Sequence, residues 1–505
     1  MKGVISAGDR LTAQAGAEIL EKGGNAFDAA VAALLAAPLA EPALTSLGGG
    51  GFLLAIERGM LPVVYDFFVD VPPKREENPD FFPVYVDFGS TVQEFHIGAG
   101  SVAVPGMVAG IYQIYRERCS LPLEELIKPA VRYAQEGIYL SPLQASFVKL
   151  LEPIFTATED SRRIYAPDGK LLDSQTLYRN PEYADFLEKF AAEGSWFFYE
   201  GEVADKIEKL SIENRGLLRK EDLRKYRVEE KDPVYFRFRG LDIFTNSPPS
   251  PGGLLIAFTL KLLEDRQLDS FGSVSHVSAL VEALHTTQVF RREHVDRNIH
   301  REGLELLLED ESLLKTYQKF FTGRLNLWGN TTHISVIDSS GNAVSTTTTN
   351  GEGSGYIIPG TGIMLNNMLG EEDLNPEGFF KWKPYLRLPS MMSPTVVMKG
   401  EEIVLSLGSA GSNRIRSAIL QVILNYTVFG MDIKTAIEKP RLHYENHTLF
   451  FEPGFDKVVI EKGKQLYETV VFDTKSLFFG GVQAVTGDFE GAGDPRRGGY
   501  TLKVY

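Results

Sequence analysis

The chain has 505 residues, of which 43% are hydrophobic and 24% are charged, a composition typical of a globular protein with a large core. Its 67 acidic and 52 basic residues give a formal net charge of −15, and the lack of a lysine or arginine cluster argues against nucleic acid as a partner. The single Cys119 excludes an internal disulfide, and the eight histidines show no metal-ligand spacing, so we expect no metal and no other cofactor.

The N-terminus shows no targeting signal. The first ten residues lack the apolar segment of a secretion signal. The longest alanine-rich run, residues 29–40, is far shorter than the ~20 residues that cross a bilayer, and it contains Pro38. We therefore expect no membrane partner and a cytoplasmic location, on the condition that no secretion leader has been removed from the sequence.

The N-terminal part predicts two helices followed by a strand. Residues 9–22 place their apolar side chains near one helical face, Gly23 and Gly24 supply a left-handed stop, and Asn25 can cap a second helix that runs to Ala37. The glycine run that follows precedes an apolar strand and not a helix, and no Gly-Lys-Ser/Thr comes after it. We interpret the glycines as scaffold and not as a phosphate site.

The middle of the chain is mainly helical in pattern. Residues 110–230 read mostly as amphipathic helices, for example 123–136, with an interruption expected at Pro129. A Pro/Gly turn at 246–253 precedes an apolar helix at 254–263. We recognise no chemistry in these helices.

The stretch 330–349 predicts a β-hairpin. Polar and β-branched residues roughly alternate up to Asp338, Ser-Ser-Gly follows, and a second β-branched run closes the stretch. If the loop consists of residues 339–341, cross-strand partners have residue numbers that sum to 680, as 338 and 342 do. Thr331 then lies opposite Thr349, with Cβ atoms about 5 Å apart, close enough for a hydrogen bond between the hydroxyls.

Thr331, held by Thr349 at the mouth of this hairpin, is a candidate nucleophile. A hydroxyl needs a base beside it, and no Gly-x-Ser-x-Gly elbow is present to supply one. Cleavage of the Asn330–Thr331 bond would give Thr331 a free α-amine with a reference pKa of about 7.7–8.0, which suits a general base. The residues alone leave open an ordinary threonine-rich hairpin.

Resemblance to a known family favours the catalytic interpretation. Asn-Thr-Thr-His-Ile-Ser-Val, then Asp-Ser-Ser-Gly-Asn-Ala-Val, resembles the processing site of the γ-glutamyltranspeptidase family, whose members are Ntn hydrolases that cut themselves before the first threonine. Gly-Gly-Asn-Ala-Phe-Asp-Ala-Ala from residue 23 and Gly-Asp-Pro-Arg-Arg-Gly-Gly from residue 493 are also similar to that family. The resemblance implies an α+β, four-layer αββα fold, in which segments 1–330 and 331–505 form one intertwined domain after self-cleavage.

The resemblance also implies where the donor binds. In relatives an arginine, an asparagine and two serines hold the α-carboxylate of a glutamyl donor; Phe68, Gly351, Ser390 and Met391 stand at those positions, and only Ser390 keeps a polar side chain. Other cations that can replace the missing clamp from a different direction are Lys74, Arg75, Lys383, Arg387 and Arg414.

Two further parts of the site follow from the same resemblance. Glu371 keeps a carboxylate for the donor's α-amine, whereas Met368 stands where relatives have its partner. The small-residue turn after an apolar strand places Gly411 and Ser412 where two backbone N–H groups of relatives form the oxyanion hole. Because backbone donors tolerate a change of side chain, Ser412 fits this role.

Together these features predict an enzyme that transfers the acyl group of a γ-glutamyl-type amide, such as glutathione, to water or an amine through an ester on Thr331. The missing carboxylate clamp leaves an Ntn acylase with a non-glutamyl donor as an alternative. A second alternative is an unprocessed, inactive relative that acts as a binding protein. The expected partners are a small-molecule amide and the two self-cleaved pieces themselves, with a homodimer of this pair left open.

Overall fold

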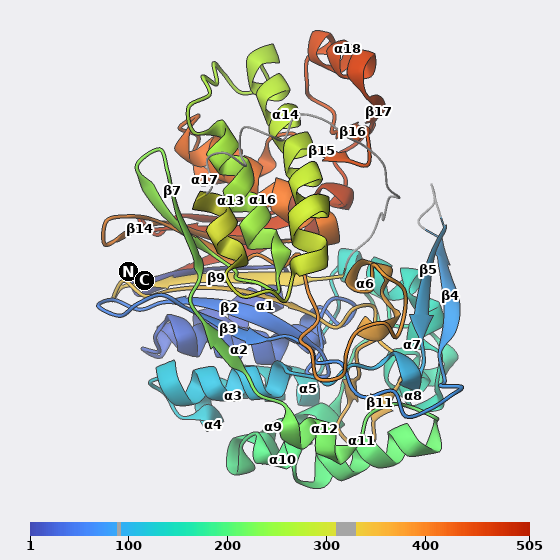
Figure 1. Ribbon diagram of the computed structural model, residues 1–505. Helices are drawn as coiled ribbons and strands as arrows, with labels where there is room; N and C mark the ends of the chain where they lie inside the picture. Colours follow the sequence, from blue (N-terminus) through green and yellow to red (C-terminus); the bar gives the residue numbers. More distant parts are fainter. Residues whose placement is uncertain (88–91, 310–329) are drawn as a thin grey trace.

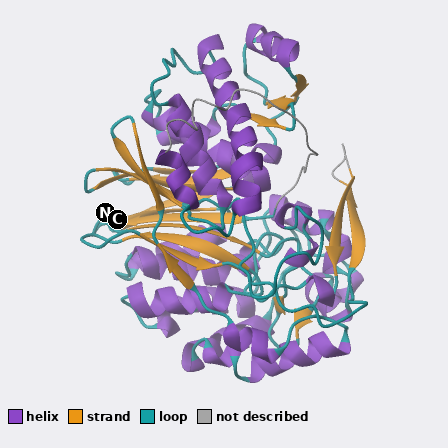
Figure 2. Ribbon diagram, in the orientation of Figure 1, coloured by secondary structure: helices purple, strands orange, loops and turns teal. Residues whose placement is uncertain are grey.

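The computed structural model describes residues 1–87, 92–309 and 330–505. Two β-sheets lie face to face in the middle of the molecule, and helices cover the outer face of each sheet (Figure 1, Figure 2). The predicted αββα layer order is therefore observed.

The first sheet contains the predicted hairpin at its centre. Within the described ranges it has seven antiparallel strands in the order β20-β1-β9-β10-β2-β3-β6. Strands that precede the Asn330–Thr331 bond in the sequence are interleaved in this sheet with strands that follow it, because β9 and β10 lie between β1 and β2. The strands are β1 (Gly3–Ala7), β2 (Gly50–Ile56), β3 (Val63–Phe67), β6 (Glu229–Lys231), β9 (Thr332–Asp338), β10 (Ala343–Thr349) and β20 (Tyr500–Val504).

The second sheet also combines both segments. Over the same described ranges it has six strands in the order β19-β18-β14-β13-β8-β7, of which only the last two precede residue 330. Its strands are β7 (Val234–Phe238), β8 (Leu241–Thr245), β13 (Thr395–Lys399), β14 (Glu402–Ala410), β18 (Gly481–Thr486) and β19 (Gly491–Gly493).

The two sheets meet through a partly polar interface on the odd-numbered face of the hairpin. Ser345 Oγ donates to the carbonyl of Leu407 in β14 at 2.8 Å. The ring nitrogens of His333 bond the hydroxyls of Thr347 and Ser335 at 2.7 and 2.9 Å, and burial lowers the pKa of His333 to about 3, so the ring is neutral. Because these buried polar groups have hydrogen-bond partners, packing the two sheets together leaves no unpaired donor or acceptor at these positions, which would cost free energy.

Helices α1 (Arg10–Glu21) and α2 (Ala26–Ala40) pack on the other face of the first sheet. Asn25 caps α2, since its side chain accepts the N–H groups of residues 27 and 28 at 2.9 Å, as the sequence predicts. The helix runs past the expected end at Ala37 and includes Pro38. Further helices lie beyond and beside α1 and α2 (Figure 1): α3 (Met107–Arg118), α4 (Leu123–Leu126), α5 (Lys128–Glu136), α6 (Pro142–Leu150), α7 (Glu152–Phe155), α8 (Glu159–Tyr165), α9 (Pro181–Glu193), α10 (Trp196–Tyr199), α11 (Glu202–Glu213) and α12 (Lys220–Lys225).

The second sheet is covered by α13 (Pro251–Leu263), α14 (Val274–Phe290), α16 (Ile415–Thr427) and α17 (Ile433–Glu438). A π-helical turn, Arg291–Val295, continues α14 toward the hairpin mouth. Smaller elements lie at the periphery: β4 (Phe82–Asp87), β5 (Val92–Ile97), β11 (Ile357–Ile358), β12 (Ile363–Met364), β15 (Leu442–Glu445), β16 (Thr448–Phe451), β17 (Glu468–Val471) and α18 (Lys457–Leu466).

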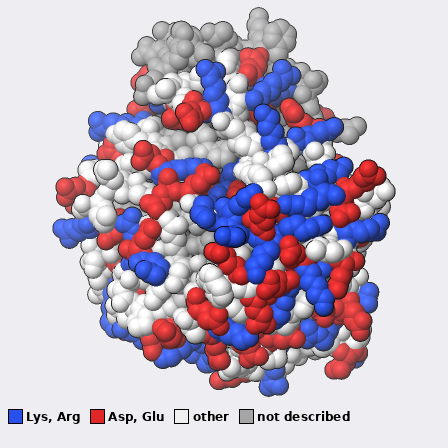
Figure 3. Space-filling model, turned by 60° about the horizontal axis from the view of Figure 1, so that its bottom comes forward, with Lys and Arg blue, Asp and Glu red and all other residues white. Residues whose placement is uncertain are grey.

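Charges are mixed on the face that Figure 3 shows, where basic and acidic side chains are interspersed. None of the helices in the described ranges is both long enough and apolar enough to cross a membrane.

Candidate active site

Thr331 lies at the mouth of the β9–β10 hairpin. The observed register pairs Thr332 with Thr348, so the predicted sum of 680 is correct, and one position further Thr331 lies opposite Thr349. Gly341 in the turn has φ +84°, the left-handed conformation that the three-residue loop requires. Both Thr331 and Thr349 are buried, and both lie on the face of the first sheet that is turned toward the second.

The Thr349 hydroxyl contacts the bond that the sequence predicts to be cleaved. Its Oγ1 donates to the carbonyl oxygen of Asn330 and accepts the backbone N–H of Gly351 at 3.0 Å. The sequence suggested that Thr349 holds the hydroxyl of Thr331. In the intact chain it holds instead the carbonyl that Thr331 would have to attack.

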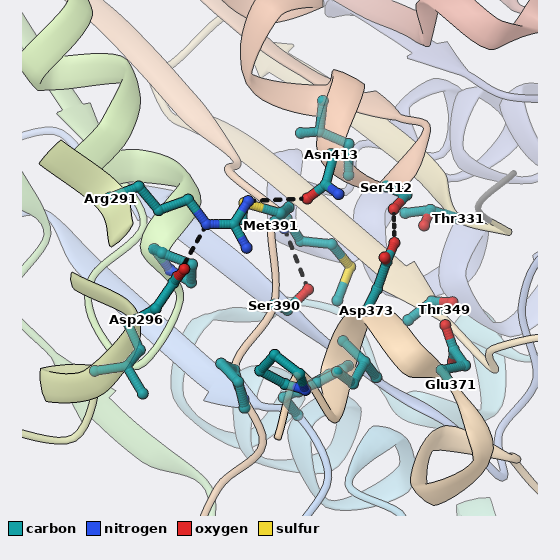
Figure 4. Close-up of a pocket in the computed structure, with 18 of the residues that line it drawn as sticks. Arg291, Asp296, Thr331, Thr349, Glu371, Asp373, Ser390, Met391, Ser412 and Asn413 are labelled. Atoms are coloured by element: carbon teal, nitrogen blue, oxygen red, sulfur yellow. Dashed lines mark hydrogen bonds and ion pairs between the residues drawn. The ribbon is translucent and has the colours of Figure 1, made fainter. Parts of the chain in front are cut away.

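A pocket opens beside the two threonines (Figure 4). Its wall combines the hairpin mouth, the segment 371–392, the turn that leads into α16, and the residues that follow α14. Gly351 and Gly411 are not among the residues that line the described wall, but Gly411 directly precedes Ser412, and the N–H of Gly351 donates to Thr349 Oγ1 at 3.0 Å. The predicted site residues that line it are Phe68, Asn330, Thr331, Thr349, Glu371, Ser390, Met391 and Ser412.

The turn between β14 and α16 has the conformation of a tight, left-handed corner. Gly411 and Ser412 have φ values of +123° and +51°. A Cβ at Gly411 would lie 2.9 Å from the Cα of Gly480, so both the backbone conformation and the packing require glycine there. Ser412 Oγ donates to the carboxylate of Asp373, which ties this turn to the segment that forms the opposite wall (Figure 4).

Two glutamates lie close to the hairpin mouth. Asn367 holds Glu352, because its Nδ2 donates to the carboxyl at 3.3 Å and its Oδ1 accepts the backbone N–H at 2.8 Å. Burial raises the pKa of Glu352 to about 8. Burial, reinforced by the negative charges of Glu352 and Asp373, raises the pKa of Glu371 well above its ordinary value.

At the positions where this chain lacks the family's carboxylate-binding side chains, the residues are closely packed. Phe68 is buried and stacks on Phe52 with 5.4 Å between the ring centroids. At Gly351, an added Cβ would lie 2.4 Å from Glu371 Oε1, so a longer side chain there would displace Glu371. Ser390 lines the pocket, and its Oγ accepts a backbone N–H at 3.2 Å.

The cations that the sequence suggested as replacements do not reach the described pocket wall. Arg387 is bonded to Asp66 at 2.7 Å and to Asp70 at 2.6 Å, which takes it out of the site. The wall contains Arg291 instead. Sequence reasoning missed this residue because it lies in a charged segment whose pattern does not show which side chain turns inward. The five suggested cations that are not part of the wall are Lys74, Arg75, Lys383, Arg387 and Arg414.

Comparison with known sequences agrees with this geometry. The sequence model of the family described as Gamma-glutamyltranspeptidase matches residues 12–504. The chain belongs to this family. It is 29% identical to the glutathione hydrolase proenzyme of Escherichia coli (strain K12), over 98% of this chain and 90% of that protein. It is 30% identical to the acylase ACY 1 proenzyme of Pseudomonas sp. (strain SE83), over 91% and 86% of the two chains.

Two solved structures share the fold. Cephalosporin acylase from Bacillus halodurans matches with a TM-score of 0.86 at 25% identity, covering 99% of this chain and 95% of that chain. The γ-glutamyltranspeptidase of Helicobacter pylori matches with a TM-score of 0.54 at 29% identity, covering 61% and 90%. The predicted family and fold are confirmed, and the protein is a γ-glutamyltranspeptidase-like acyl-transfer enzyme.

Proposed function

We propose that the protein cleaves its own Asn330–Thr331 bond and then transfers the acyl group of a γ-glutamyl-type amide to water or an amine through an ester on Thr331. The hydrogen bond from Thr349 to the Asn330 carbonyl carries this proposal. It polarises the one carbonyl that the Thr331 hydroxyl has to attack in self-cleavage.

In self-cleavage the Thr331 hydroxyl attacks the carbonyl carbon of Asn330. Negative charge develops on the carbonyl oxygen, where the Thr349 hydroxyl already donates. Collapse of the intermediate breaks the C–N bond, leaves Asn330 as an ester on Thr331 Oγ1, and passes the proton to the freed α-amine. Water then hydrolyses the ester. Because both sheets contain strands from 1–330 and from 331–505, the two pieces stay in one folded unit.

In turnover the free α-amine of Thr331 acts as the general base for its own hydroxyl. Oγ1 attacks the amide carbonyl of the donor, and the backbone N–H groups of Gly411 and Ser412 stabilise the oxyanion. The protonated amine then gives its proton to the departing amine, and water or a second amine releases the acyl group from Thr331. Once the Asn330 carbonyl has left, the Thr349 hydroxyl is available to the nucleophile opposite it.

The family favours γ-glutamyl amides such as glutathione as donors, and the Escherichia coli relative is named a glutathione hydrolase. A second candidate is an acylase for a different acyl group. Phe68, Gly351 and Met391 offer no side-chain hydrogen bond to an α-carboxylate, and relatives named acylases match the chain equally well.

Intact-mass analysis of freshly purified protein, before and after exposure to γ-glutamyl and simple acyl p-nitroanilides, tests the proposal. We expect two pieces, of 330 residues and of the remaining 175 of the 505, and an acyl adduct on the piece that begins with Thr331. A single full-length chain without an adduct would favour the alternative of an inactive binding protein. Size-exclusion chromatography of the cleaved protein tests whether the pieces stay associated and form a homodimer.

A further inference from the structure

The pocket wall contains a cation to which the proposed mechanism gives no role. Arg291 begins the π-helical turn that continues α14, and its side chain lines the pocket (Figure 4). Its Nε donates to Asp296 Oδ1 at 2.9 Å, and its Nη1 donates to Asn413 Oδ1 at 3.3 Å. A guanidinium has five N–H donors, and these contacts use two of them. Donors therefore remain for a further acceptor.

The two contacts fix the guanidinium relative to the turn at Gly411 and Ser412, which holds the proposed oxyanion donors. Asn413 directly follows Ser412, and consecutive Cα atoms are only ~3.8 Å apart. The Arg291 side chain is 17% exposed, and the negative charge of Asp296 holds the pKa of Arg291 above its ordinary value although burial alone would lower it. Arg291 is thus a charged, immobilised group in the same pocket as the nucleophile.

The chemistry of the rest of the wall suits a short hydrocarbon chain. The described wall has three acidic residues: Asp296 accepts from Arg291 Nε at 2.9 Å, Asp373 accepts the Ser412 hydroxyl, and burial raises the pKa of Glu371 well above its ordinary value. Several other wall residues are apolar and can cover methylene groups: Phe68, Ile299, Leu374, Trp382, Met391 and Met392.

We propose that Arg291 binds a carboxylate at the end of the donor's acyl chain, in place of the arginine whose position Phe68 occupies. The substrate class is then amides of acyl chains that end in a carboxylate, of which the γ-glutamyl group is the member that also carries an amine. This inference rests on the proposed acyl transfer. Burial of a carboxylate is costly without a paired cation, and a guanidinium can bind it through two parallel N–H donors.

Four p-nitroanilides that differ only at the far end of the acyl chain test this. Glutaryl and γ-glutamyl carry the carboxylate, whereas butyryl and 4-aminobutyryl lack it; γ-glutamyl and 4-aminobutyryl carry the amine. We expect wild-type kcat/KM to be at least ~10-fold higher for glutaryl than for butyryl, since a hydrogen-bonded charge is worth about 1.5–3 kcal/mol. Arg291→Met should lower kcat/KM about 10- to 100-fold for the two carboxylate donors and leave the other two nearly unchanged.

Two controls separate recognition from structure. Arg291→Lys keeps the charge and should retain part of the preference for glutaryl. Arg75→Met removes a guanidinium that pairs with Asp222 at 2.6 Å outside the pocket, and it should leave the ratio of glutaryl to butyryl turnover unchanged.

The outcomes are distinguishable. Equal loss for all four donors in Arg291→Met would assign Arg291 a structural role and overturn the inference, and so would an unchanged ratio of glutaryl to butyryl turnover. Failure of wild-type protein to turn over any of the four donors, with no acyl adduct on Thr331, would overturn the proposed function itself.

Discussion

Thr349→Val is the sharpest test of the proposed role of the hairpin in self-cleavage. Valine keeps the β-branched shape that suits β10 but removes the hydroxyl that donates to the Asn330 carbonyl. This oxygen becomes an oxyanion in the transition state, and loss of one preorganised donor typically costs about 10²- to 10³-fold in rate. We expect self-cleavage to slow by about 10²-fold, equivalent to ~2.7 kcal/mol in the barrier.

The substitution also affects stability and turnover. It leaves the Gly351 N–H without the acceptor that it has at 3.0 Å, which should destabilise the fold by about 1–3 kcal/mol. If the hydroxyl later serves the nucleophile, acyl-transfer turnover should fall about 5- to 150-fold, the cost of one hydrogen bond to a reacting group. Thermal unfolding of the variant separates this effect on stability from the effect on rate.

The assay follows the disappearance of full-length chain on denaturing gels after synthesis in a cell-free system. Thr346→Val is the matched control, because Thr346 is buried in the same strand and its Oγ1 also donates to a backbone carbonyl, that of Phe52, at 3.0 Å. Normal processing of Thr349→Val, or equal slowing of both variants, would refute the argument.

Three further predictions concern the same region. Thr331→Ala should abolish both self-cleavage and turnover, whereas Thr331→Ser should keep some of each, as gels and p-nitroanilide release can show; ordinary processing of the alanine variant would sink the Ntn mechanism. Ser412→Ala removes the hydroxyl that donates to Asp373 but keeps the backbone N–H, so kcat should fall less than about 10-fold. Glu41 is buried and accepts a hydrogen bond from Thr332 Oγ1 at 2.6 Å. Burial raises the pKa of Glu41 to about 8, so between about pH 4.5 and 8 the folded state keeps a proton that the unfolded state has lost. The free energy of unfolding should therefore fall as pH rises from about 4.5 to 8. Glu41→Gln should reduce this fall, by on the order of a few kcal/mol, in thermal unfolding at pH 5 and pH 8.5.

The hairpin could be predicted because its information is local. Alternation gives the strands, and the Ser-Ser-Gly loop gives the register, since only a residue that tolerates positive φ fits at Gly341. The cap at Asn25 is local in the same sense. The sequence places the end of α2 three residues too early, because Pro38 is accommodated in the last turn of the helix, which ends at Ala40.

The charged groups of the site could not be predicted, because tertiary contacts decide which of them face the pocket. Arg387 and Asp66 are 321 positions apart in the chain and neutralise each other only in the folded protein. Arg291 and Asn413 meet across 122 positions. The sequence gives the identity of such residues but not their pairing. The absence of an arginine at the position of Phe68 therefore does not by itself define what the pocket binds.

In the proposed mechanism, the hydroxyl of Thr349 is used twice. A threonine hydroxyl has a single O–H to donate, and in the intact chain the Asn330 carbonyl takes it. It can therefore not act on Thr331 Oγ1 as a donor until cleavage removes that carbonyl. We expect the antiparallel register to keep Thr349 opposite Thr331 after cleavage as well, because the hydrogen bonds between β9 and β10 do not involve the Asn330–Thr331 bond. In the proposed mechanism, the same strand pairing thus serves self-cleavage first and acyl transfer afterwards.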